Sequence, residues 1–218
     1  MLLVFFKLTP KSFSSTWALP LLFLFVFLAP SDSIGQSQTR LAGAGATSGG
    51  AGTGWTTPGR IVSDNNSYAT VVSTSERLLS SDYGFTIPAG SVINGIELEV
   101  ERNTNNTNSG RFANDNTVRL IRGGTVIGDN KAVATNYGTS FAVITYGSPT
   151  DLWGTTWTVA QINATNFGAA FSVNIGGGAQ TVNVDFMRIT VHYTAITSFS
   201  PTTACEGEEV EITGTNFN

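Results

Sequence analysis

The clearest pattern in the chain is an alternation of hydrophobic and polar residues with a period of two. From Ile96 to Glu101, apolar side chains alternate with glutamates, which is typical of a strand with one buried and one solvent-exposed face. The same period predicts that the stripe of apolar residues between 187 and 193 faces the core. We expect these residues to lie inside: Ile96, Leu98, Val100, Val118, Leu120, Phe171, Ile189 and Val191.

Glycine pairs mark the turns between the predicted strands. Gly123–Gly124 predicts a hairpin between strands at 117–121 and 125–127, and Gly176–Gly178 predicts a second hairpin between 167–175 and 181–194. Only 159–164 has a helical pattern, and it is too short for the crossover that parallel strands need. The sequence therefore predicts an all-β fold, an antiparallel, jelly-roll-like β-sandwich over residues 53–195.

The N-terminal region has the pattern of a signal peptide. Lys7 and Lys11 precede an apolar run over 17–29, which is short for a membrane-spanning helix but suits the core of a signal peptide. Small residues before Gln36 predict that residues 1–35 are removed by a cut before Gln36, with no integral membrane span afterwards. An N-terminal membrane anchor is the alternative, because the apolar residues 2–6 lengthen the segment.

Residues 36–52 are rich in glycine, alanine and serine. Such a composition buries little apolar surface to offset the entropy of ordering the chain. We therefore expect a flexible linker ahead of the sandwich.

Composition narrows the class of protein. Only 12% of the 218 residues are charged and the formal net charge is −4, with no cluster of basic residues, so we expect no nucleic-acid partner. At 41%, the hydrophobic fraction is too high for a disordered chain. The single cysteine, Cys205, excludes an internal disulfide framework.

The last segment reads Ile196-Thr-Ser-Phe-Ser-Pro201 and then Gly207-Glu-Glu-Val210-Glu-Ile212-Thr-Gly214-Thr-Asn216-Phe217. This pattern resembles the opening of an IPT/TIG domain. The resemblance implies that residues 196–218 are the start of an immunoglobulin-like domain, which is incomplete here.

Other motifs are spread over residues 53–195, among them Trp55-Thr-Thr-Pro58, Phe85-Thr-Ile-Pro88-Ala-Gly90, Asp151-Leu-Trp-Gly154 and Asp185-Phe-Met-Arg-Ile-Thr-Val191. Together they resemble a β-sandwich module of secreted bacterial proteins and of phage tail-associated proteins. This resemblance implies an architecture rather than an activity.

Four aromatic residues are the candidates for ligand binding: Trp153, Trp157, Tyr137 and Tyr146. Rings on loops can stack on the apolar face of a sugar. The competing interpretation is that these rings fill the core and close the ends of the sandwich.

Acidic residues supply the candidate metal ligands. Asp64 and Asp185 offer carboxylate oxygens for a structural calcium ion, although aspartates are also common in turns. The glutamates at 97, 99 and 101 share a strand face, where we expect them to be solvated and to pair with Arg102, Arg119 or Arg188. His192, the only histidine, is expected on the outer face, and we expect no catalytic residues and no cofactor beyond that calcium.

Two functions fit these observations. The first is a non-catalytic, secreted or cell-surface protein for adhesion or surface display, with glycans or cell-surface proteins as partners. The second is a carbohydrate-binding module attached to a hydrolase encoded beyond residue 218.

Overall fold

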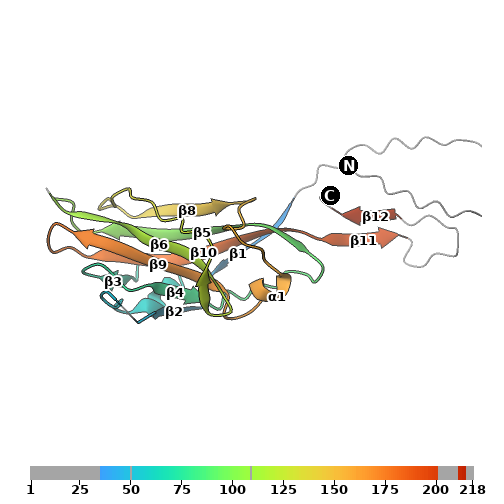
Figure 1. Cartoon of the computed structure of the whole chain (residues 1–218), viewed down its shortest axis with the longest axis horizontal. Helices are drawn as coiled ribbons and strands as arrows, with labels where there is room; N and C mark the ends of the chain where they lie inside the picture. Colours follow the sequence, from blue (N-terminus) through green and yellow to red (C-terminus); the bar gives the residue numbers. More distant parts are fainter. Residues whose placement is uncertain (1–34, 50, 109, 201–210, 215–218) are drawn as a thin grey trace, which may run out of the picture. The chain divides into compact units, whose positions relative to one another are not determined.

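The computed structural model describes residues 35–49, 51–108, 110–200 and 211–214 (Figure 1). The chain divides into two units. One is Gln36–Ala195, and the other has as its described elements the strands β11 (Ile196–Ser200) and β12 (Glu211–Gly214). The described chain is nearly all antiparallel β-sheet, so the predicted all-β sandwich is confirmed.

The first sheet of the larger unit contains five strands. Its order is β1-β10-β5-β8, and β3 pairs with the same long strand β10. The bounds are β1 (Gln36–Leu41), β3 (Ala69–Val71), β5 (Val92–Thr104), β8 (Ala142–Ser148) and β10 (Val182–Thr194).

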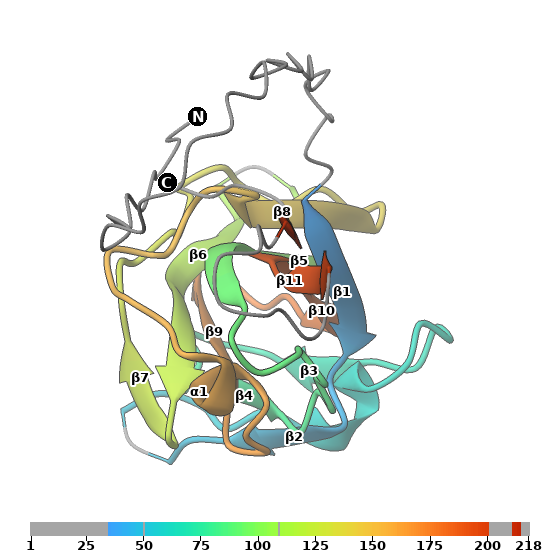
Figure 2. The same cartoon turned by 90° about the vertical axis from the view of Figure 1, so that its right-hand side faces the viewer.

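The second sheet also contains five strands, in the order β2-β4-β9-β6-β7. Figure 2, a view along the strands, shows the two sheets facing each other. The bounds are β2 (Ala44–Thr47), β4 (Leu78–Ser81), β6 (Phe112–Arg122), β7 (Thr125–Ile127) and β9 (Gly168–Gly176). Two short helices complete the unit, η1 (Pro58–Ile61) and α1 (Val159–Ile162).

The core lies between the two sheets and contains the residues that the alternation predicted. All eight side chains expected inside have 0% exposure. The phase of both long strands is therefore as predicted, with His192 on the outer face.

The alternation is interrupted at three register shifts in these sheets, one of them between His192 and Tyr193 near the end of β10, and the other two lie beside acidic residues. In β10 the register with β5 shifts between Val184 and Met187, so two residues oppose the single residue Glu101. In β6 the register with β9 shifts between Asp115 and Thr117. An extra residue inverts the face of everything that follows it, so the bulge in β6 leaves Asp115 facing inward.

The prediction of a flexible linker over 36–52 is wrong for most of that segment. Residues 36–41 form β1 along β10, and residues 44–47 form β2 along β4. Backbone pairing with neighbouring strands orders a segment that has few apolar side chains to bury. The glycines contribute to packing here, because a Cβ on Gly43 or Gly45 would collide with the backbone carbonyls of Asp82 or Pro58.

The predicted hairpins have different outcomes. The strands β6 and β7 form the first one, and α1 lies within the predicted helical segment. The second prediction is wrong, because β9 and β10 belong to different sheets. The turn after Gly176 carries the chain across the sandwich.

In the other unit, β11 pairs with β12 in antiparallel fashion, with Phe199 opposite Ile212. The helices of the described residues are all too short to cross a membrane.

Candidate functional site

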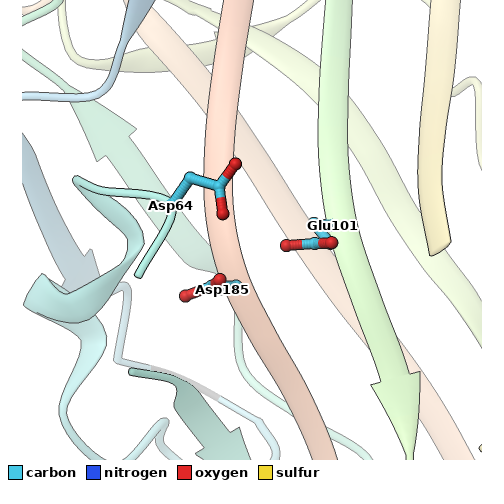
Figure 3. A group of neighbouring side chains, drawn as sticks. All are labelled: Asp64, Glu101 and Asp185. Atoms are coloured by element: carbon cyan, nitrogen blue, oxygen red, sulfur yellow. The ribbon is translucent and has the colours of Figure 1, made fainter. Parts of the chain in front are cut away.

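Three carboxylates meet on the outer face of the first sheet (Figure 3). Asp64 belongs to the loop after η1, Glu101 to β5 and Asp185 to the bulge of β10. One carboxylate oxygen from each lies within 4.8 Å of the others. The structure thus brings together the two predicted calcium ligands, Asp64 and Asp185, and adds Glu101.

Asp185 is held in place by the loop that crosses it. Its Oδ2 accepts from the backbone N–H of Asn66 at 3.0 Å, and its Oδ1 accepts from that of Ser67 at 3.2 Å. Asn66 has φ 59°, in the left-handed region that asparagine tolerates better than most residues. The side chain is consequently almost fully buried, with 1% exposure for the residue.

Three carboxylates this close together repel one another, so the cluster favours the binding of a proton or a cation. Burial, and then the charges of Asp185 and Asp64, raise the pKa of Glu101 above its ordinary value. A hard cation such as Ca²⁺ would be coordinated by these carboxylate oxygens, with further oxygens needed to complete six to eight ligands.

Replacing Glu101 with glutamine is expected to change the pH dependence of stability. Because the folded-state pKa of Glu101 is raised, stabilisation from its bound proton is complete below the ordinary pKa of glutamate and is lost as the pH rises through the raised pKa. Urea unfolding should therefore find Glu101→Gln more stable than the wild type near neutral pH, with the difference vanishing in acid.

The control is Glu99→Gln, two residues along the same strand, where Arg188 and not another carboxylate faces the side chain. Equal pH profiles for the wild type and Glu101→Gln would contradict the prediction. Repeating the unfolding with and without Ca²⁺ tests the calcium prediction, since a bound ion would raise the wild-type midpoint more than that of Glu101→Gln.

The other two glutamates of β5 pair with basic residues of β10. Glu99 accepts from Arg188 Nε at 2.6 Å, and Glu97 Oε2 lies 2.7 Å from His192 Nε2. The pairing with Arg188 is as predicted, whereas Arg102 faces inward and pairs elsewhere.

The predicted ligand residues Tyr137 and Tyr146 lie in a buried network around Asp115. Their hydroxyls donate to its carboxylate at 2.5 and 2.9 Å. Arg102 Nη2 lies 3.3 Å from Asp115 Oδ1, and its guanidinium stacks 3.6 Å from the centre of the Tyr137 ring. Burial raises the pKa of both tyrosines well above the usual value. Both rings are therefore part of the core network.

Trp153 closes the sandwich from a strained backbone position. The residue has 0% exposure and φ 60°. Its indole Nε1 donates to the carbonyl of Ile96 at 2.8 Å, and its backbone N–H donates to Asp151 Oδ1 at 2.7 Å. The ring therefore fills the core between the β5 strand and the 151–157 loop.

Trp157 lies at the boundary between core and surface, with 8% exposure. Its ring packs edge-on against Phe167, with centroids 5.3 Å apart, and its Nε1 donates to the carbonyl of Leu152 at 3.1 Å. Of the four aromatic residues predicted to bind a ligand, Trp157 lines the open groove described next.

The groove lies beside α1 and has a volume of about 730 Å³. Residues of the 87–93 segment form one wall, and residues of the 152–163 segment form the other. Its main apolar side chains are Ile87, Ile93, Leu152, Trp157 and Val159. One polar atom in the lining, Ser91 Oγ, is buried with no hydrogen-bond partner among the described residues.

Sequence reasoning missed Glu101 and the groove. Glu101 continues the alternation of the two glutamates before it, and nothing in the sequence shows that a bulge of β10 lies opposite. The groove joins two segments about 65 residues apart in the chain, although the pattern around Trp157 did indicate a loop.

The chain matches no protein-family model, no curated protein and no solved structure.

Proposed function

We propose that this chain is a non-catalytic, secreted or cell-surface protein in which a β-sandwich, followed by the start of an Ig-like domain, serves adhesion or surface display. The observation that carries the proposal is the chemistry of the groove beside α1. Every residue that lines it is uncharged, and most are apolar. Proton transfer needs a titratable group at the reacting atoms, whereas an open apolar surface with a few polar atoms suits binding.

Export is supported by the first 35 residues and by the position of β1. The basic and apolar pattern of 7–29 is that of a signal peptide. The expected cut precedes Gln36, and β1 begins at Gln36. Cleavage there would leave intact the strand that pairs with β10.

Expression with fractionation and N-terminal sequencing tests this proposal. We expect the protein in the extracellular or surface fraction with Gln36 as its first residue. Recovery from the membrane fraction with Met1 retained would overturn export and support the alternative of an N-terminal anchor.

The second candidate function is a carbohydrate-binding module attached to a hydrolase. It is favoured by the combination in one groove of an indole ring and the buried hydroxyl of Ser91, which has no partner among the described residues, since sugars present both apolar faces and hydroxyl groups. A glycan array decides between the two. Binding that Trp157→Ala abolishes, with the urea midpoint retained, would support the module, and no binding by the wild type would exclude it for the glycans tested.

A further inference from the structure

The strand β8 forms one edge of the first sheet (Figures 1 and 2). It pairs with β5 on one side, with Leu98 opposite Tyr146 and Val100 opposite Ile144. The backbone N–H of Ile96 points toward the β8 side of β5, where it donates to the carbonyl of Asp151. The N–H groups of Leu98 and Val100, at every second position, point to the same side. Antiparallel pairing therefore leaves the alternate residues of β8, Val143 and Thr145, with their N–H and C=O groups directed away from β5.

These outward groups are free among the described residues. The backbones of Val143 and Thr145 make no hydrogen bond to any loop in that part of the chain. Both side chains are exposed as well, with 43% exposure for Val143. An edge with free backbone groups is a template for another strand.

Three other strands at the ends of the two five-stranded sheets, β1, β2 and β7, are protected in ways that β8 is not. At the edge of β1, the side chain of Gln38 bonds both the N–H and the carbonyl of Thr86. The strand β2 is four residues long and packs against η1, and β7 is only three residues long. The strand β8 has seven residues, and these are alanine, valine, isoleucine, threonine, tyrosine, glycine and serine.

The charge pattern of this edge is also distinctive. There is no charged residue from Ala132 to Thr150, a segment that contains all of β8 and the loop before it. Edge strands are usually protected by charges, which repel or fail to pair with an incoming strand. The chain as a whole is acidic, with a formal charge of −4. Because this edge carries no charge, two copies that approach through it bring no like charges into contact.

We propose that β8 pairs with β8 of a second copy of this chain, antiparallel and about a two-fold axis at Thr145. This arrangement places Thr145 opposite Thr145 of the second copy. The two first sheets then form one continuous sheet through two uncharged edges. The glutamates of β5 lie one strand back in each copy, so the two rows stand three strand spacings apart, about 14 Å. That distance exceeds the Debye length of about 8 Å in physiological salt, so their repulsion is screened.

A second copy fits this edge because the contact is self-complementary. Each β8 supplies the N–H and C=O groups that the other lacks, and neither brings a charge into the contact. A two-fold contact also uses both edges, so assembly stops at two copies.

The mass of the full chain in solution tests the proposal, measured by sedimentation over a range of concentrations. The test variant is Thr145→Lys, which places like charges opposite each other in the dimer, while within one copy the new lysine faces Glu99 across the sheet. The matched control is Thr47→Lys on β2, an edge strand of the other sheet, where the threonine already bonds Glu76. Thermal unfolding of each variant checks that the fold is retained.

We expect a wild-type dimer, a Thr145→Lys monomer and a Thr47→Lys dimer. In addition, hydrogen exchange of the peptide covering 142–148 should slow as the wild-type concentration rises, and that of Thr145→Lys should not. A monomeric wild type overturns the proposal, as does a dimer that survives Thr145→Lys or dissociates equally in Thr47→Lys. Growth beyond two copies overturns the closed two-fold contact.

Discussion

Replacing Trp153 with alanine is expected to lower the free energy of unfolding by about 3–5 kcal/mol, the usual cost of truncating a buried tryptophan. The ring of Trp153 is fully buried, and the carbonyl of Ile96 would lose the hydrogen bond that the indole Nε1 donates to it. Gly147 packs directly against this indole, since a Cβ there would lie 2.8 Å from Trp153 Nε1. The cavity would therefore open between β5, β8 and the 151–157 loop.

Urea denaturation at constant pH measures this effect. Val72→Ala is the control, because Val72 is 61% exposed and its truncation should change the free energy by less than about 0.5 kcal/mol. Trp153→Phe should lose less than Trp153→Ala, since the phenyl ring fills part of the space. An unchanged midpoint for Trp153→Ala would show that the ring is not a core residue and would return it to the ligand candidates.

Replacing Asp115 with leucine is expected to cost about 3–5 kcal/mol, because it leaves a buried guanidinium without its counter-ion. Arg102 is only 5% exposed, and Asp115 is its ion-pair partner. The hydroxyls of Tyr137 and Tyr146 would also lose their acceptor. The loss of stability therefore comes from the unpaired charge of Arg102 as much as from the missing contacts.

The double variant Arg102→Met/Asp115→Leu separates these causes. Removing both charges should cost clearly less than the sum of the two single changes, giving a coupling energy in a double-mutant cycle. Glu99→Gln is the control for a partly exposed ion pair, with an expected cost of about 0–1 kcal/mol. Additive losses in the cycle would contradict a coupled buried pair.

The sequence by itself determined the phase of the long strands. Alternation at 96–101 and 187–193 placed one set of side chains inside, because a strand with one buried face needs an apolar residue at every second position. It also indicated the β6–β7 hairpin through two glycines and the short helix α1. The predicted calcium ligands Asp64 and Asp185 were found together, although they are far apart in the chain.

The tertiary structure decided which strands are neighbours. The segment 36–47 has too few apolar residues to indicate strands, and only the backbones of β10 and β4 order it. The strands β9 and β10 look like a hairpin in the sequence, yet each completes a different sheet. Such pairings depend on backbone hydrogen bonds to distant strands, and those bonds leave no pattern in the side chains.

The bulges decided where Asp185 and Asp115 point. Strict alternation from Met187 would turn Asp185 into the core, and the bulge in β10 instead directs it toward Glu101 on the outer face. The bulge in β6 does the reverse for Asp115, which it turns inward to Arg102. The side-chain period of a strand is two, so one extra residue exchanges the faces, and only the register of the partner strand fixes where that residue is inserted.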